Sequence, residues 1–419
     1  MAESLDSASA SVAASVRGDT TRLPVRARRL DSITEVDAAE WDACFASADP
    51  FVHHAFLAAL ERHGCASIET GWTPAHGVLQ DGAGKLIAAA PAYLKDHSWG
   101  EFVFDFSWAD AAQRAGIRYY PKLVCAVPFT PVTGPRLGVR NAAARGALAP
   151  ALVAGLRRTM TDIDASSLHV LFPEPADDAA LRSGGGIERH DVQFHWRNAD
   201  YADFDDFLAR LTHDRRKKIL RERRRVAEAG LRLEWQRGDE LSEAAWHSVF
   251  TLYAHTYLER GEQPYLNLPF FLDYGRQPGT PLRIVSVHDG ARRVAAAIFA
   301  LGGNTLYGRH WGAAAHYDSL HFETCYYQGV DYCIRHRLSH FDAGAQGAHK
   351  LVRGFAPETT SSWHWLADPR LARAVARALQ AEGRQVAVQR DALAKFLPYR
   401  HTAAGPQAPE SHPRQDPSP

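Results

Sequence analysis

The order of predicted helices and strands repeats once along this chain, and the repeat constrains its fold more than any other feature. Each half contains, in order, helices, an antiparallel meander of strands, a helix, a strand and a final helix. That order is typical of an α+β layer fold used twice. A chain of 419 residues is too long for one ordinary core and suits two domains. We therefore predict domains at 30–198 and 199–400, between disordered tails at 1–29 and 401–419.

The expected elements follow from hydrophobic periodicity and from turn residues. In the first half we expect helices at 38–45, 51–63, 108–115 and 142–163, and strands at 75–80, 86–94, 101–106, 122–127 and 168–172. In the second half we expect helices at 204–229 (broken near Asp214), 243–260, 269–274, 321–337, 371–381 and 390–397, and strands at 231–235, 282–288, 292–301, 305–311 and 340–345. Asp289-Gly290 lies between two strand-like runs and predicts a tight hairpin.

Charge and cysteine usage exclude several classes of protein. Lysine plus arginine and aspartate plus glutamate each number 48, so the whole chain has no general attraction to nucleic acid or anionic lipid. The five cysteines are scattered and lack CxxC spacing, which argues against a disulfide framework and a cysteine-based zinc site.

Neither a signal peptide nor a membrane-spanning run is apparent, and we expect a cytoplasmic protein.

Several long segments carry a family resemblance. They are PAYLKDHSWGEFVFDFSWADAAQRAGIRYYPKL, AVPFTPVTGPRL, QFHWRN, RRKKILRERRRV, LYGRHWG, LHFETCYYQGVDYCI and FDAGAQGAHKLVRGFAP. Together they cover most of residues 40–375 and resemble the FemAB-like branch of the acetyltransferase-like superfamily, a bacterial family labelled peptidoglycan biosynthesis protein or N-acetyltransferase. The resemblance implies two tandem acetyltransferase-like (GNAT-fold) domains.

The same resemblance implies an acyl- or aminoacyl-transferase that acts on an amine. Its better-known relatives move aminoacyl groups from charged tRNA to cell-wall precursors, and more distant relatives use acyl-CoA. We therefore expect acyl-CoA or aminoacyl-tRNA as co-substrate, no tightly bound cofactor, a small-molecule or cell-wall-precursor amine as acceptor, and possible tRNA or transient membrane contact. One departure concerns acyl-CoA: WGAAAHYDSLHFE contains one glycine, Gly312, and lacks the Gln/Arg-x-x-Gly-x-Gly/Ala turn that holds pyrophosphate at a helix start.

Direct acyl transfer to an amine needs a proton acceptor and a stabilised oxyanion. The helix predicted at 321–337 buries the stripe Phe322, Cys325, Tyr326, Gly329 and Cys333, which leaves Glu323 near the first turn. We predict Glu323 as general base, although the carboxylate would equally complement the helix dipole. The predicted catalytic set is Glu323, Tyr307, Tyr327 and His349. No metal is expected, because His321 and Glu323 point in different directions on a helix.

Donor-binding residues are predicted in three places. Alternation puts Tyr307, Arg309 and Trp311 on one face of a strand, where they suit an anionic or aromatic donor or form a surface aromatic ladder. His321 and Gln328 share a helix face. A loop with Gly344 and Gly347 allows close backbone approach, or is a structural turn, and presents Gln346, His349, Lys350 and Arg353. We predict that Glu323, Tyr307, Arg309, His349 and Lys350 converge on one cleft.

A run of eight bases at 215–225 is the strongest local charge feature. Lys217, Lys218, Arg221 and Arg224 are predicted to contact a polyanionic donor, whereas a charge run is otherwise a solvated helix face. Two other functions stay open: a nucleic-acid-binding module, and a catalytically inactive scaffold of the same fold. In the first half, a dense polar set predicts either a groove lining or an inter-domain salt-bridge network: Glu101, Asp105, Asp110, Arg118, Tyr119, Tyr120 and Lys122.

Overall fold

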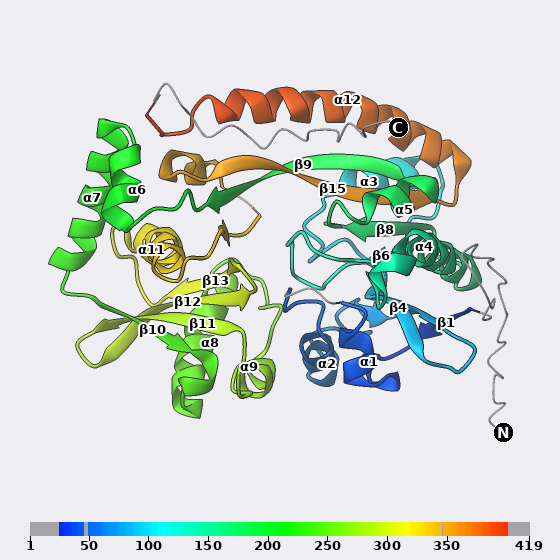
Figure 1. Ribbon diagram of the computed structural model, residues 1–419, viewed down its shortest axis with the longest axis horizontal. Helices are drawn as coiled ribbons and strands as arrows, with labels where there is room; N and C mark the ends of the chain where they lie inside the picture. The colour runs from blue at the N-terminus through cyan, green and yellow to red at the C-terminus, as the bar shows by residue number, and fades with distance from the viewer. Residues whose placement is uncertain (1–24, 46–48, 346, 401–419) are drawn as a thin grey trace, which may run out of the picture.

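The computed structural model describes residues 25–45, 49–345 and 347–400. Within them, the strands form a four-stranded sheet, in the order β1-β3-β4-β7, and an eleven-stranded sheet, in the order β10-β11-β12-β13-β14-β9-β15-β8-β6-β5-β2. Figure 1 shows the second half of the chain on the left and the first half on the right, joined by β9 and β15. Helix α12 lies along these two strands and contacts both.

The first half begins at an edge strand and ends in a long one. Its elements are β1 (Arg26–Leu30), α1 (Ala38–Asp42), α2 (His54–Arg62), β2 (Thr73–Pro74), β3 (His76–Gln80), β4 (Leu86–Ala90), β5 (Ala92–Lys95), α3 (Phe106–Arg114), β6 (Lys122–Cys125), β7 (Gly138–Val139), α4 (Arg145–Asp162), β8 (Ser167–Leu171), α5 (Asp178–Ser183) and β9 (Ile187–Arg197). Strands β6 and β8 are parallel, and α4 makes the crossover that a parallel pair requires.

The second half follows a similar order. Its elements are α6 (Phe204–Arg210), α7 (His213–Glu228), β10 (Arg232–Arg237), α8 (Glu243–Leu258), α9 (Leu268–Tyr274), β11 (Leu282–Asp289), β12 (Arg292–Gly302), β13 (Thr305–Ala313), α10 (Leu320–Phe322), the π-helical turn η4 (Glu323–Tyr327), α11 (Gln328–Arg335), β14 (His340–Asp342), η5 (Ala348–Arg353), β15 (Ala356–Leu366) and α12 (Pro369–Ala394). The hairpin between β11 and β12 has the predicted turn, with Gly290 at a φ of 55°. Here β13 and β14 are the parallel pair.

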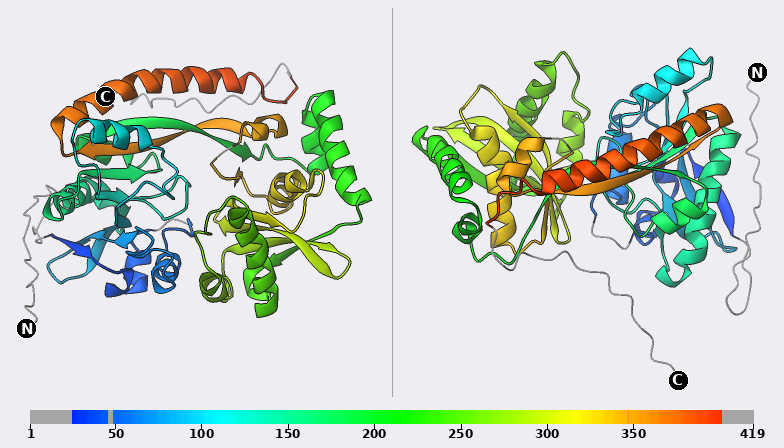
Figure 2. Two further views of the ribbon diagram at one scale, coloured as in Figure 1. Left: turned by 180° about the vertical axis from the view of Figure 1, so that it is seen from behind. Right: turned by 90° about the horizontal axis from the view of Figure 1, so that it is seen from above.

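The two halves exchange strands. β15 comes from the second half but pairs with β8 of the first half, and β9 comes from the first half but pairs with β14 of the second. The two exchanged strands also pair with each other. The view from above in Figure 2 shows α12 crossing between the two lobes. The division at residue 198 stays a prediction about domains, but the sheet is continuous across that point.

A shared core reinforces this exchange. One cluster of buried side chains contains Trp41 and Phe51 from the first half and Trp246 and Ile298 from the second. Phe51 packs edge-on against Tyr307, with ring centroids 5.2 Å apart. Burying apolar surface from both halves stabilises their association as well as each half.

Three sequence-based expectations are wrong. The tail predicted to reach residue 29 includes the first four residues of β1 (Arg26–Leu30), which pairs with β3. Residues 101–106 form no strand, because carboxylates in this segment bind a buried lysine described below. The helices expected at 371–381 and 390–397 are one helix, α12. Strands β9 and β15 are absent from the prediction, and residues 1–24 and 401–419 lie outside the described residues.

Of the helices in the described ranges, none has the length and apolar character needed to cross a membrane.

Candidate functional site

The parallel strands β13 and β14 pair over three residues and then diverge. The last pair joins Tyr307 to Asp342. Beyond it, the strands separate around a cavity of about 140 Å³. The cavity is lined by Ala297, Ile298, Phe299, Gly308, Arg309, His310, Trp311, His321, Cys325, Tyr326, Ala343 and Gly344. We call it the splay cavity.

A bulge in β13 determines which side chains reach the splay cavity. Phe299 pairs with Gly308 and Ile298 with His310, so Arg309 is the extra residue. A bulge shifts the alternation by one residue. His310 therefore lies with Tyr307 on the face of the shared core, against Tyr253 of α8, while Trp311 lies on the opposite face. The prediction that Tyr307, Arg309 and Trp311 share one face is wrong for this reason.

The helix after β13 supplies the opposite wall. His321, Cys325 and Tyr326 line the cavity, and the wider π-helical turn lies at 323–327. The hydroxyl of Tyr326 is 2.8 Å from Nε2 of His349. Burial raises the pKa of Tyr326, so its hydroxyl keeps its proton and can donate it to the imidazole. Burial, Arg353 and Lys350 lower the pKa of His349, which favours the neutral, proton-accepting ring.

Lys350 lies beneath the loop that follows β14. Its side chain is buried, and its ammonium donates to the carbonyl oxygen of Gly344. Burial lowers the pKa of Lys350 to about 8, against an opposing effect of Asp342. Gly344 and Gly347 have φ values of 87° and 116°, a region that favours glycine. The predicted Gln346 falls outside the described residues.

Two half-buried histidines, His310 and His321, are among the residues that line the splay cavity. Burial and the charge of Arg309 lower the pKa of His310 to about 3. Burial, His349, Arg353 and Lys350 lower that of His321 to about 4. Arg309 itself donates from Nη2 to the backbone oxygen of Phe129 in the first half. The cavity thus combines one fixed cation with neutral imidazoles at neutral pH.

Other predicted residues anchor α7 rather than line the cavity. Glu323 is buried and accepts from Arg223 at 3.2 Å and from Gln328 at 2.9 Å. Arg353 donates to Glu222 of α7 and, from Nε, to the hydroxyl of Tyr327.

The predicted convergence is therefore partial. Arg309 and His321 line the cavity. His349 and Lys350 contact residues that line it. The remaining predicted residues contact other groups: Glu323, Tyr307, Tyr327, Gln328 and Arg353.

The basic helix α7 has two different faces. Its inner face buries Ile219, Glu222 and Val226. On the outer side, three predicted bases are exposed: Lys217, Arg221 and Arg224. Lys218 is half-buried, with Nζ 3.9 Å from a Glu222 oxygen.

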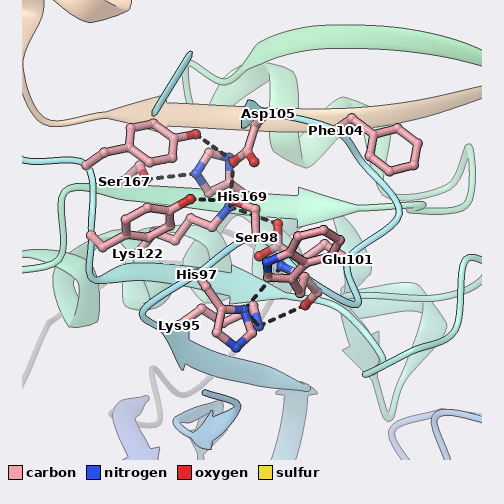
Figure 3. Close-up of polar contacts among 12 residues, drawn as sticks. Lys95, His97, Ser98, Glu101, Phe104, Asp105, Lys122, Ser167 and His169 are labelled. Atoms are coloured by element: carbon pink, nitrogen blue, oxygen red, sulfur yellow. Dashed lines mark hydrogen bonds and ion pairs between the residues drawn. The ribbon is translucent and has the colours of Figure 1, made fainter. Parts of the chain in front are cut away.

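A second polar cluster lies inside the first half (Figure 3). Lys122 has no exposed side-chain surface, and its ammonium contacts Ser98, Glu101 and Asp105. Tyr119 donates to Asp105 at 2.6 Å, and Tyr120 contacts Ser98 at 2.8 Å. Of the predicted polar set, Arg118 instead pairs with Asp164 near the surface. Five of the seven predicted residues therefore form, with Ser98, a buried network that fixes the loop between β5 and α3, whereas Asp110 is exposed.

Sequence reasoning missed several residues of the splay cavity. Gly308 within a strand signals a bulge or a close backbone approach, and it could have indicated that His310 and Trp311 change faces. Ala343 and Gly344 carried no chemical signal of their own. They line the cavity because they directly follow the last paired residues of β13 and β14.

Comparison with known proteins identifies the family to which the chain belongs. The model of the FemAB-like family, described as peptidoglycan biosynthesis/recognition, matches residues 32–401. No curated protein matches the chain in sequence. The crystal structure of FemX has a TM-score of 0.50 at 11% identity and covers 81% of this chain and 98% of its own. A tandem GNAT protein from the clavulanic acid biosynthesis pathway has a TM-score of 0.44 at 14% identity, covering 82% and 99%.

These comparisons confirm the predicted α+β fold of tandem acetyltransferase-like halves. The family match runs from before α1 to the end of the described residues and spans far more than half of the chain. The protein therefore belongs to the FemAB-like family.

Proposed function

We propose that this protein transfers an acyl or aminoacyl group from a phosphate-bearing donor to an amine, and that the reaction takes place in the splay cavity. The observation that carries the proposal is the divergence of β13 and β14 after Tyr307 and Asp342. Two glycines, Gly308 and Gly344, line the cavity, and at glycines backbone can approach a ligand closely.

The proposed chemistry uses side chains at the cavity wall. The amine nitrogen attacks the donor carbonyl, the new carbon–nitrogen bond forms, and the bond to the donor's oxygen or sulfur breaks. The amine proton passes to Tyr326, whose own proton moves to Nε2 of His349, 2.8 Å away, and the same pair in reverse returns a proton to the leaving oxygen or sulfur. Lys350 supplies a nearby positive charge for the oxyanion. In this proposal His349 takes the part first predicted for Glu323, because Glu323 is bound to Arg223 and Gln328.

Donor and acceptor follow from the family and from charge. The exposed bases of α7 support a donor with phosphates, either aminoacyl-tRNA or acyl-CoA. The family description supports an amine of a cell-wall precursor as acceptor.

The five cysteines are free, which supports a cytoplasmic location in this proposal.

Filling the cavity tests the proposal. The full chain would be incubated with acetyl-CoA or glycyl-tRNA and with glucosamine or a lysine-containing muropeptide, and products detected by mass spectrometry. Ala343→Leu places three extra carbons at the cavity wall and should reduce transfer about 100-fold, because small displacements of reacting groups are costly. Ala381→Leu, on the exposed side of α12, is the matched control and should retain activity. Equal activity of both variants would contradict the assignment of the cavity.

A second candidate, polyanion binding without transfer, is favoured by the outer face of α7 alone. It predicts retention of tRNA by wild type and by Ala343→Leu equally, with no product in either case.

A further inference from the structure

The splay cavity lacks a group that could neutralise a positive charge. Among the described residues that line it, none is aspartate or glutamate. An ammonium taken from water into such a site needs a carboxylate or several free carbonyl oxygens, since an unpaired charge is strongly disfavoured there. The acyl part of an aminoacyl donor carries such an ammonium, and a simple acyl group does not.

Two carboxylates closest in sequence to the lining residues are already engaged. Asp342 is buried, and its Oδ1 accepts from the backbone nitrogen of Gly344 at 2.8 Å. Its Oδ2 lies 3.8 Å from Nε2 of His195. The single charge of Asp342 also acts on two cations, Arg309 and Lys350. Glu323 is held by Arg223 and Gln328, as described above.

Two cations lie at or near the cavity wall, where they would repel an ammonium. Arg309 lines the wall, and a guanidinium stays charged in proteins. Lys350 already places its own ammonium on the carbonyl oxygen of Gly344 at the cavity rim. Protonation of His321 is suppressed by burial and by the charges of His349, Arg353 and Lys350, as its lowered pKa indicates. A site that disfavours a proton on imidazole disfavours a substrate ammonium for the same reasons.

We infer that the group transferred in the splay cavity is an acyl group without an ammonium, either uncharged or bearing a carboxylate, and not an aminoacyl group. This inference rests on the proposed function and narrows its donor. The cavity, of about 140 Å³, has room for a small acyl group.

The test uses ligand pairs that differ in one ammonium. On coenzyme A, the pair is propionyl-CoA and β-alanyl-CoA. On the adenosine end of tRNA, it is the 3′-acetamido and 3′-glycylamido derivatives of 3′-deoxyadenosine 5′-phosphate. Binding to the full chain is measured by calorimetry. On whichever carrier binds, the uncharged member should bind at least about tenfold more tightly, since an unpaired buried charge costs more than the corresponding free energy.

The outcomes separate the two proposals. If the ammonium-bearing member binds equally well or better, the inference is overturned while the proposed function stands. If neither carrier binds, the proposed function falls and the inference falls with it. Malonyl-CoA extends the panel and distinguishes an uncharged from a carboxylate-bearing acyl group, both of which agree with the inference.

A variant arm assigns the discrimination to the cavity. Ala343→Asp introduces a carboxylate at the wall and should abolish or reverse the preference within each pair. Ala381→Asp, on exposed α12, should leave the preference unchanged. Should Ala343→Asp fail to fold, Arg309→Met removes the lining cation and should reduce the preference in the same direction. A preference that survives a folded Ala343→Asp and Arg309→Met would show that it arises elsewhere, against the inference.

Discussion

The buried ammonium of Lys122 holds several side chains of one loop in place. The ammonium contacts Ser98, Glu101 and Asp105, which are spread along one loop. For Asp105, burial alone would raise the carboxyl pKa, but Lys122 outweighs it and holds that pKa below its usual range. In the neighbouring Glu101, burial raises the pKa to about 7 in spite of Lys122. The lysine is therefore the shared partner of two buried carboxylates.

Replacing this lysine should strongly destabilise the first half. Lys122→Met leaves Glu101 and Asp105 buried without their partner, which should lower the free energy of unfolding by about 3–5 kcal/mol. Arg118→Met breaks a solvent-exposed pair with Asp164 and should change it by less than about 1 kcal/mol. Urea unfolding followed by tryptophan fluorescence measures both. A loss below 1 kcal/mol for Lys122→Met would mean that the network contributes no stability.

Single residues also show what periodicity alone can predict. Alternation correctly places Leu306 and Tyr307 on opposite faces of β13, but it fails after Gly308, where the bulge adds a residue. A bulge depends on the pairing of two strands, and this pairing is not visible in one segment of sequence. The same holds for Glu323: its helix was predicted, but Arg223, its partner, lies 100 residues away.

At the scale of elements, α7 combines a role in the core with an exposed basic face. Glu222 binds Arg353 and Tyr327, and Arg223 binds Glu323, so the inner side is tied to the walls around the splay cavity. The outer bases have no such role in packing. This separation makes it possible to change the outer charges without disturbing the fold.

Neutralising the outer face should weaken polyanion binding. The triple variant Lys217→Ala, Arg221→Ala and Arg224→Ala should bind tRNA more weakly and reduce the slope of log K against log salt by about 2–3. Filter binding across a salt series measures this. The control replaces Arg373, Arg377 and Arg384, which are exposed on α12. If both triple variants lose the same slope, α7 is a solvated face and not a binding surface.

The elements themselves were predictable where apolar residues set the pattern. The hairpin of β11 and β12 and the helix at 321–337 were predicted in this way. Strand β15 was not, because the side chains it buries include Thr360, Ser362 and His364, which look exposed in a sequence. His364 is buried against His169 of β8, with the two Nδ1 atoms 2.6 Å apart. Such polar residues become core residues when another strand supplies their partner.

At the scale of the whole molecule, strand exchange joins the halves. One edge of β8 pairs with β15, which comes from the C-terminal part of the chain. Without β15 that edge of β8 has no partner. The shared core around Phe51 and Tyr307 adds a second link. Each half is therefore stabilised by residues that lie outside the predicted domain boundary at residue 198.

This arrangement predicts that the first half cannot fold alone. Residues 25–198, expressed without the rest, should show no cooperative urea transition, because β8 and β9 lose β15 as a partner. Joining residues 355–396 to this fragment through a flexible linker restores β15 and α12 and should recover part of the transition. A cooperative transition in the fragment without β15 would show that the exchanged strand is dispensable.

Because of the strand exchange, β8 is synthesised well before its partner β15. His169 and His364 are separated by 195 residues, which a ribosome adds over roughly 10–40 s at ~5–20 residues per second. During that interval the segment that becomes β8 has no β15 to pair with, and an unpaired strand segment can pair with other chains. The nascent protein pairs this segment with β15 only when its last strand has left the exit tunnel. Its yield in a cell therefore depends on protection of one strand segment throughout synthesis of the second half.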